Sequence, residues 1–259
     1  MNDASLDVAG NKKPVWWKLA RNFRRAFRSP LPDYRAYQAL VRDKRGIEIG
    51  GPTKLFRRDL PLYRVARSID GVNFTTSTMW EGRLTEGAPY RYAKAKAGRQ
   101  FIADATDLSR LPAGGYGFVL SSNNLEHIAN PLRAVGEWLR LLCPGGHLVL
   151  VLPRKESNFD HRREITPFAH LVRDSEQGTT EHDLTHLDEI LERHDYAMTP
   201  ETADPATLES RGRQNFANRG LHHHVYDAAL IEQVLRHFGL EPVLQTTTAT
   251  DYIAAARKS

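Results

Sequence analysis

The stretch GFVLSSNNLEHIANPLRAVGEWLRLLCPGGHLVLVLP, residues 117–153, holds a strand, a helix and a second strand in one run. The apolar runs at 117–122 and 146–153 have the length and composition of buried strands. Between them, Asn130 and Pro131 mark a helix start, because an Asn side chain caps the first turn and proline is favoured at its first position. The helix then presents a buried stripe of Leu132, Val135, Leu139 and Leu142, and Pro144-Gly145-Gly146 ends it. The stretch therefore predicts a β-α-β unit with parallel strands.

The same alternation of strands and helices extends from residue 45 to the C-terminus. Further strands are predicted at 46–50, 64–70 and 99–105. A capped helix, DAALIEQVLRHFG, and two strand-like segments, LEPVLQTTT and DYIAAARK, close the pattern. Strands that alternate with helices form a mostly parallel sheet with helices on both faces. The predicted fold is α/β, a doubly wound, Rossmann-like sheet of seven strands with an insert before the last helix.

Composition limits the class of protein. The chain has 259 residues, 41% hydrophobic and 26% charged, which is typical of a globular protein of one or two domains. Its single cysteine, Cys143, excludes an internal disulfide and a cysteine-rich zinc module. No apolar run approaches the roughly 20 residues that span a bilayer, and no secretory leader pattern follows the N-terminus. We therefore expect a cytoplasmic protein.

Residues 1–30 form a basic arm. They hold seven Lys and Arg against two Asp, so their net charge of +5 equals that of the whole chain. Within 12–28, apolar residues recur at helical spacing and cations fill the other positions, as in an amphipathic helix that lies on an anionic membrane surface. This would place the protein peripherally at the inner membrane surface. The alternatives are a helix docked on the protein's own body or a solubilising arm. Nucleic acid ranks last among the partners, because residues 31–259 supply no net basic charge.

Glycines and carboxylates end the first three predicted strands, where ligands bind in sheets of this kind. Glu48 and the Gly50-Gly51 turn close the first strand, Asp70 ends the second, and Asp104 ends the third. Asp70 stands 20 residues after Gly50, where a carboxylate can accept hydrogen bonds from both hydroxyls of a ribose. Asp104 is placed to accept a hydrogen bond from the exocyclic amine of adenine. The three strand ends together indicate an adenosine.

The glycine patterns that bind phosphate are missing. The first strand is not followed by G-x-G-x-x-G, and the chain has no G-x-x-x-x-G-K-[ST]. The expected ligand therefore has an adenosine but no phosphate, and a cationic centre that favours a bare turn with a carboxylate nearby. S-adenosylmethionine meets these conditions.

These features resemble the class I S-adenosylmethionine-dependent methyltransferases, and among them the type 11-like methyltransferase domain. The resemblance covers residues 31–153 and 226–259. It rests on IEIGG, SIDG, ADATDLSRLP, the stretch around LEHIANP, and HHHVYDAALIEQVLRHFGLEPV. The family's first loop usually reads G-x-G-x-G, whereas Gly50-Gly51-Pro52-Thr53 compresses it here.

The resemblance implies a contact for each part of the cofactor. The methionine end is expected at Glu48, Gly50 and Gly51, and the ribose at Asp70. The adenine is expected at Asp104 and the backbone of Ala105. Two residues at the end of the fourth strand, Ser121 and Asn123, complete the implied cofactor site.

Residues 154–225 have no place in the core fold and are too long for an ordinary loop, so we expect a lid or a substrate subdomain. This insert holds eight of the chain's eleven histidines. His182 and His186 have an i, i+4 spacing that suits metal ligands, although a solvated helix face has the same spacing. His222 and His224 would share one face of an extended segment, either as catalytic groups beside the substrate or as packing for the insert.

His127 is the first candidate for a general base, because it follows the fourth strand near the expected acceptor and an imidazole titrates near neutral pH. The pair Glu126-His127 also resembles the E-x-x-E-H motif with which small-RNA 2′-O-methyltransferases bind a metal. Here Asn123 replaces the first glutamate. A divalent metal completed by a histidine of the insert is therefore an alternative, with its ligands undefined.

The predicted activity is methyl transfer from S-adenosylmethionine to an oxygen or nitrogen of a small-molecule or glycan acceptor. The chain lacks D/N-P-P-[YFW], which argues against methylation of adenine N6 or a glutamine amide, and lacks Pro-Cys, which argues against cytosine C5. A lipid-linked saccharide is the natural acceptor if the arm binds a membrane. The alternatives are an RNA methyltransferase and a cofactor-binding module without turnover.

Overall fold

The computed structural model describes residues 30–78, 80–199 and 204–259. The predicted membrane-binding segment, 12–28, and all of the basic arm except Pro30 lie outside these ranges. Within the described ranges, no helix is both long enough and apolar enough to cross a membrane.

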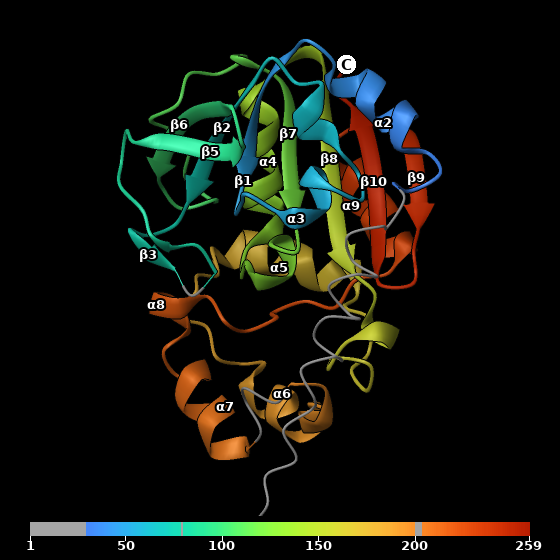
Figure 1. Cartoon of the computed structure of the whole chain (residues 1–259). Coiled ribbons are helices and arrows are strands. Elements are labelled where there is room, and N and C mark those ends of the chain that lie inside the picture. The colour runs from blue at the N-terminus through green and yellow to red at the C-terminus, as the bar shows by residue number, and fades with distance from the viewer. Residues whose placement is uncertain (1–29, 79, 200–203) are drawn as a thin grey trace, which may run out of the picture.

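Eight strands form one sheet in the order β5-β6-β2-β1-β7-β8-β10-β9 (Figure 1). The five strands from β6 to β8 are parallel, β10 runs antiparallel to both β8 and β9, and β5 runs antiparallel to β6. The strands are β1 Arg45–Ile49, β2 Ser68–Asn73, β5 Pro89–Ala93, β6 Lys96–Ile102, β7 Tyr116–Ser122, β8 Leu142–Pro153, β9 Glu241–Thr247 and β10 Asp251–Arg257. A separate pair consists of β3 Ser77–Thr78 and β4 Gly82–Arg83.

The predicted α/β fold with a mostly parallel, Rossmann-like sheet is confirmed, and the sheet has one strand more than the seven predicted. The additional strand, β5, alternates buried Tyr90 and Tyr92 with exposed residues. It was missed because a short segment that begins with proline becomes a strand only through its pairing with β6. The second strand was predicted too early, at 64–70, because Leu62–Arg64 forms a 3-10 turn (η1) and β2 begins at Ser68.

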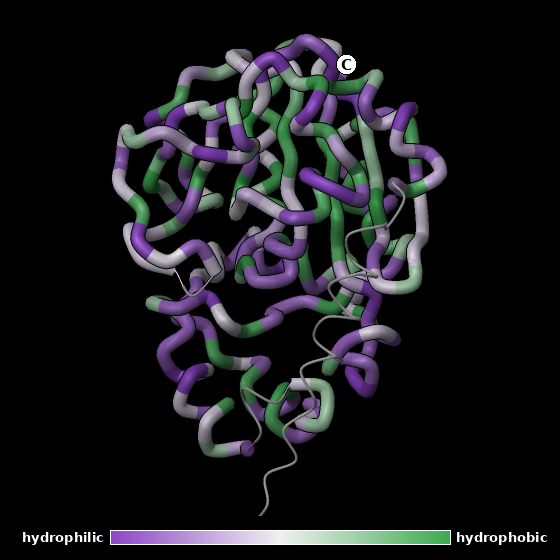
Figure 2. Tube along the Cα trace, in the orientation of Figure 1, coloured by the Kyte–Doolittle hydropathy of each residue, from purple (hydrophilic) through white to green (hydrophobic). Residues whose placement is uncertain are grey.

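Helices cover both faces of the sheet. On one face lie α4 Pro131–Leu141, α5 Phe168–Gln177 and α9 Ala228–His237, and on the other α2 Tyr34–Val41 and α3 Lys54–Arg57. The strand β8 shows why both faces are apolar: Leu148 and Leu150 enter the core beside α4 and α9, while Val149 and Val151 enter the core beside α2 and α3. Hydrophobic residues accordingly run along the central strands (Figure 2).

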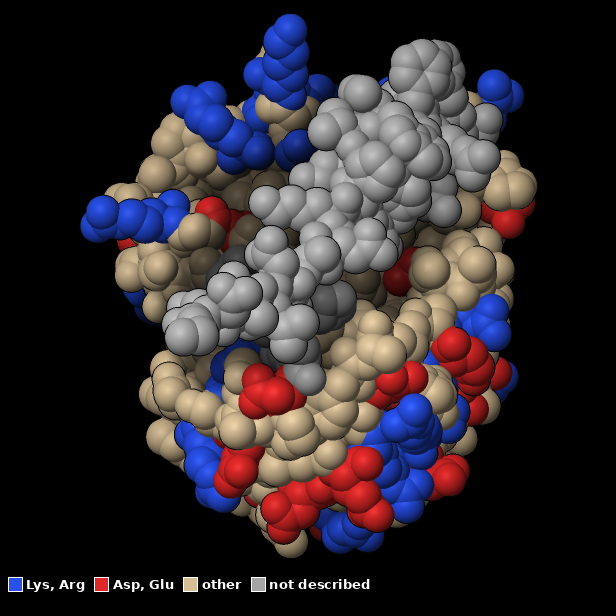
Figure 3. All heavy atoms as spheres, turned by 60° about the horizontal axis from the view of Figure 1, so that its bottom comes forward, with Lys and Arg blue, Asp and Glu red and all other residues tan. Residues whose placement is uncertain are grey.

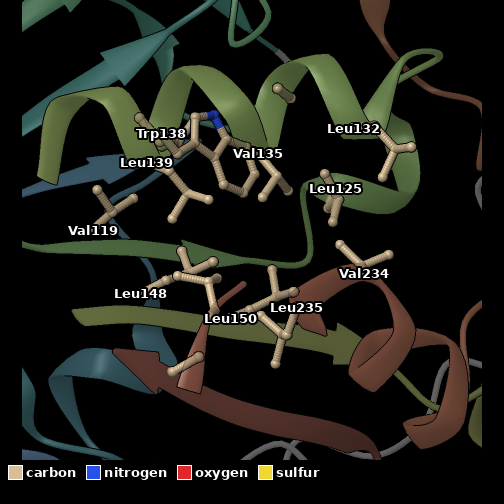
Figure 4. Packing of buried hydrophobic residues seen from close by; sticks show 14 of the residues in the cluster. Val119, Leu125, Leu132, Val135, Trp138, Leu139, Leu148, Leu150, Val234 and Leu235 are labelled. Atoms are coloured by element: carbon tan, nitrogen blue, oxygen red, sulfur yellow. The ribbon is translucent and has the colours of Figure 1, made fainter. Parts of the chain in front are cut away.

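Helix α4 begins where the sequence predicted. The Asn130 side chain accepts a hydrogen bond from the backbone N–H of Arg133 at 3.1 Å, and Pro131 occupies the first turn. Its buried face includes Trp138 and Leu139, which point toward the sheet and α9 (Figure 4). The helix ends at Leu141, and β8 follows without a loop.

The region predicted as an insert lies beyond the carboxyl ends of the parallel strands (Figure 1). It contains α5, whose Leu171 belongs to the main core, and three further helices, α6 Leu187–Arg193, α7 Pro205–Gly212 and α8 Asn215–Asn218. A small separate core joins α6 and α7 through Leu187, Ile190, Leu208 and Leu221. The outer face of this region carries acidic and basic side chains together (Figure 3). Short 3-10 turns lie at η2 Leu125–His127, η3 Lys155–Ser157 and η4 Tyr196–Met198.

Candidate functional site

A cavity of about 540 Å³ lies at the carboxyl ends of the strands, between the sheet and the insert. Its volume is within the range of ordinary small-molecule sites. The predicted site residues that line it are Gly50, Asp104, Ala105, Asn123, His127 and His222. Five other predicted residues do not line it: Glu48, Gly51, Asp70, Ser121 and His224.

The turn after β1 brings backbone to the cavity wall. Gly50 has φ +77, and a Cβ there would lie 2.6 Å from Oδ1 of Asn124, so only glycine fits this position. A Cβ on Gly51 would lie 2.3 Å from the carboxyl carbon of Glu48, on the side away from the cavity. The two glycines therefore allow the backbone to lie close to Asn124 at the cavity and close to the buried carboxylate of Glu48.

Glu48 supports this turn from behind. Its carboxylate accepts hydrogen bonds from the hydroxyls of Tyr63 and Tyr90, each at 2.6 Å, and from the N–H of Thr53 at 3.2 Å. Burial raises the pKa of Glu48 to about 7, despite these hydrogen bonds. The side chain is 1% exposed and has no opening to the cavity, so its place is beneath the loop.

The expectation that Asp70 ends its strand is wrong. Asp70 lies three residues before the end of β2, opposite Ile47, and accepts hydrogen bonds from Arg45 at 2.8 Å and Tyr116 at 3.0 Å. The residue that ends β2 at the cavity is Asn73, whose amide donates to the carbonyl of Gly51 at 3.2 Å. The predicted strand ended three residues too early because Leu62–Arg64 forms η1, so that β2 begins only at Ser68 and ends at Asn73.

Asp104 and Ala105 lie at the cavity after β6. The carboxylate of Asp104 accepts from the N–H of Thr106 at 2.8 Å and pairs with Arg219 at 2.8 Å. The carbonyl of Ala105 accepts from the indole N–H of Trp138 at 3.1 Å, so α4 fixes this loop.

Arg219 connects this part of the cavity to the insert. It also pairs with Glu181 at 2.7 Å, and its guanidinium lies 5.2 Å from the ring of Phe74. No local pattern in the sequence marks this residue, because its contact with Asp104 joins positions 115 residues apart.

At the end of β7, the residues that line the cavity differ in part from those predicted. Ser121 is fully buried within the sheet, and its neighbour Ser122 lines the cavity instead. Asn123 lines the cavity with φ +48, a conformation that Asn tolerates better than most residues.

Three side chains form an acceptor cluster, defined as Glu126, His127 and His222, at the end of the cavity. The Nδ1 of His127 lies 3.0 Å from the carbonyl of Leu221, and the Nδ1 of His222 lies 2.5 Å from Oδ2 of Asp160. Both rings therefore donate from Nδ1, and the neutral His127 keeps Nε2 as an acceptor. Oε2 of Glu126 is buried without a hydrogen-bond partner.

Burial sets the charges in this cluster. It raises the pKa of Glu126 to about 7 and, together with His222, lowers the pKa of His127 well below its ordinary value. Burial alone would lower the pKa of His222, but Asp160 raises it. Ligand atoms of the cluster lie within 4.8 Å of one another, so the cluster can share a proton or hold a cation.

Two aromatic rings wall the cluster, and sequence reasoning missed both. The ring of Trp80 lies 5.4 Å from that of His127 although the side chain is 51% exposed, and the ring of Phe159 lies 4.7 Å from that of His222. An isolated Trp in the polar stretch TSTMWEG was the available signal for an exposed contact residue.

His224 lies behind the cavity wall, close to His170 and His186 rather than to His222. His186 precedes α6 instead of lying within it, so the helical i, i+4 pairing expected for His182 and His186 does not occur. The ring of His182 stacks on Phe216 at 4.0 Å.

Comparison with known proteins points to one family and one fold. The model of a family described as "methyltransferase domain" matches residues 19–245. An S-adenosylmethionine-dependent methyltransferase from Mesorhizobium loti has a similar structure, with a TM-score of 0.50, 15% identity, and coverage of 90% of this chain and 99% of that one. A search of curated proteins finds no match.

Two further solved structures are similar at lower scores. The 1,6-didemethyltoxoflavin-N1-methyltransferase of Burkholderia thailandensis, with bound substrate and S-adenosylhomocysteine, has a TM-score of 0.48 and 11% identity, and covers 100% of this chain and 93% of its own. The N-methyltransferase NodS of Bradyrhizobium japonicum has a TM-score of 0.45 and 14% identity, with coverage of 94% and 97%.

Proposed function

Because the chain belongs to the methyltransferase-domain family and has the class I S-adenosylmethionine-dependent fold, we propose that it transfers the methyl group of S-adenosylmethionine to an oxygen or nitrogen of a small-molecule acceptor. The observation that carries this proposal is one cavity lined at once by the strand-end residues Asp104 and Ala105 and by the acceptor cluster.

We place the cofactor along the strand ends. The adenine would lie at Asp104 and Ala105, and the methionine end at the Gly50 turn. Lys54, which lines the cavity at the start of α3, supplies a cation for the cofactor's carboxylate. The ribose would lie near Asn73, since Asp70 is withdrawn into the sheet.

The acceptor would lie against the acceptor cluster and the rings of Trp80 and Phe159. Flat aromatic walls with a few polar groups suit a planar or sugar-ring acceptor. Methyl transfer is an in-line displacement at the sulfonium, so the site mainly holds the acceptor atom against the methyl group and excludes water. An acceptor hydroxyl must also lose a proton, for which Nε2 of His127 and Oε2 of Glu126 are the free acceptors.

Calorimetric titration with S-adenosylmethionine and S-adenosylhomocysteine tests cofactor binding. We expect binding to the wild type and at least tenfold weaker binding to Asp104→Asn, because a carboxylate lost at the adenine end removes a charge-assisted hydrogen bond. Asp107→Asn is the matched control, since Asp107 is exposed in the same loop and outside the cavity. Absence of heat for both ligands with an intact fold would refute the proposal.

Transfer of a labelled methyl group to a panel of small phenols, amines and glycosides tests the acceptor side. His127→Asn and Glu126→Gln should lower kcat by roughly 10²- to 10⁴-fold if the base lies in the acceptor cluster, while cofactor affinity stays unchanged. His182→Gln is the control. Transfer that proceeds equally well in both variants would show that the acceptor needs no base from this cluster.

The remaining alternatives make different predictions. An RNA methyltransferase would bind RNA with a steep salt dependence, and a module without turnover would bind the cofactor and methylate nothing in the panel. Glycan acceptors, a cytoplasmic location and membrane contact through residues 12–28 stay predictions of the sequence.

A further inference from the structure

A second group of histidines lies outside the cavity, where the insert meets the core. We call it the tri-histidine group and define it as His170, His186 and His224. One ligand atom of each lies within 4.8 Å of the others, and their ring centroids are 4.9, 5.7 and 5.8 Å apart. None of the three lines the cavity. The group is therefore separate from the acceptor cluster.

The three ligands come from three different segments. His170 lies in the first turn of α5, His186 directly before α6, and His224 in the extended segment before α9. If these histidines only covered a solvated helix face, they would lie on one helix. Instead, three separate segments bring them together. It brings together α5, the part of the insert that packs into the main core, and α6, which packs in the small separate core.

Asp174, one turn after His170 in α5, lies beside two members of the group. Its Oδ2 lies 3.4 Å from Nε2 of His170 and 3.5 Å from Nε2 of His224, yet this oxygen has no hydrogen-bond partner. Ligands of a tetrahedral zinc ion at 2.0–2.1 Å are separated by about 3.3 Å. The two distances are close to that separation, and Nε2 of His224 also lies 3.4 Å from the carbonyl oxygen of Ala129.

An unpaired buried oxygen is a separate sign of a missing partner. The side chain of Asp174 is 9% exposed, and its Oδ2 lacks a hydrogen bond. A buried polar atom without a partner destabilises the fold, and a bound cation would relieve this cost.

Imidazoles bind metals in their neutral form. On the solvent side, exposed Arg173 lies 3.4 Å from Nδ1 of His170 and can swing away.

We propose that His170, His186 and His224, with Asp174 as the fourth ligand, bind a transition-metal ion that fastens the α6 end of the insert to α5, which packs against the sheet. Three imidazoles and one carboxylate favour Zn²⁺, and a closed set of four protein ligands is typical of a structural site. The ion would stabilise the chain by binding only the folded state, and it would hold the wall behind the cavity without touching the substrate.

Metal binding to the full-length, chelator-treated protein tests this proposal. We expect one equivalent of Zn²⁺, an increase in Tm on its addition, and a tetrahedral visible absorption band with Co²⁺ in its place. His186→Gln should weaken Zn²⁺ binding at least 100-fold. His182→Gln, four residues earlier and stacked on Phe216, is the matched control and should bind as the wild type does.

Glu126→Gln separates the two candidate metal groups. Zn²⁺ binding that survives in Glu126→Gln but is lost in His186→Gln supports the tri-histidine group. If His186→Gln does not fold, Asp174→Asn replaces it, with loss of the tetrahedral Co²⁺ band as the expected result. The proposal is overturned if the wild type binds no stoichiometric Zn²⁺, or if binding is lost in Glu126→Gln and kept in the histidine variant.

Discussion

At the scale of single residues, Glu48 shows how a buried carboxylate ties the turn after β1 to the sheet. Burial raises its pKa from an ordinary 4.5 to about 7. Between these pH values the unfolded chain releases the proton while the folded chain retains it, so the folded state loses stability as the pH rises. The loss is complete above pH 7 and absent below pH 4.5.

Glu48→Gln should remove this pH dependence. The wild type should lose roughly 3 kcal/mol more than the variant between pH 4.5 and pH 7.5, as expected for a shift of this size. Urea unfolding of both proteins across this range measures the difference. Parallel stability curves for the two proteins would show that Glu48 has an ordinary pKa in the fold.

Gly50 is the residue at which the bare turn can be tested. Gly50→Ala should destabilise the fold by about 1–3 kcal/mol, because φ is positive and the added Cβ meets Asn124, and it should weaken S-adenosylmethionine binding at least tenfold. Gly114→Ala is the control: φ is also positive, +67, but no atom lies within 4 Å of the added Cβ. Equal cofactor affinity in the two variants would contradict a role of this turn in binding.

At the scale of elements, helix α4 both fills the core and fixes a cavity loop. Trp138 is fully buried and donates its indole N–H to Ala105. Trp138→Ala should cost about 3–5 kcal/mol in unfolding free energy because it leaves a large cavity. Trp138→Phe retains most of the packing but loses the hydrogen bond to Ala105. It should therefore lower the unfolding free energy less than Trp138→Ala does, and its main effect should be weaker cofactor binding.

Denaturant unfolding and cofactor titration of both Trp138 variants separate the two roles. A Trp138→Ala protein that loses less than about 1 kcal/mol would mean that α4 repacks freely. Cofactor affinity unchanged in Trp138→Phe would mean that the Ala105 loop is held by other contacts.

At the scale of the whole molecule, Arg219 joins the insert to the sheet. Its ion pairs with Asp104 and Glu181 are mostly buried, since its side chain is 13% exposed. Arg219→Ala leaves two carboxylates unpaired, which is strongly destabilising for buried pairs. We expect limited proteolysis to cleave the insert several-fold faster in this variant than in the wild type.

Arg213→Ala is the control for that experiment. Arg213 pairs with Glu209 on α7 at 2.6 Å, but its side chain is 62% exposed, and exposed pairs contribute little. Equal cleavage rates in both arginine variants would indicate that the insert is held by its apolar contacts alone.

The sequence by itself determined the fold class and much of the order of elements. Apolar periodicity, the Asn130 cap and the glycine turns are local signals, and each acts within a few residues of the backbone it shapes. The same signals placed Gly50, Asp104 and His127 at the cavity, because parallel strands end at one edge of the sheet.

Only the tertiary structure decided which side chains share a site. A shift of three residues in β2 withdrew Asp70 and brought Asn73 to the cavity, because alternate residues of a strand face opposite ways and only the last ones reach its end. His222 and His224 are two residues apart, yet the fold assigns one to the acceptor cluster and the other to the tri-histidine group. Such groupings depend on the packing of segments distant in sequence, which local patterns do not encode.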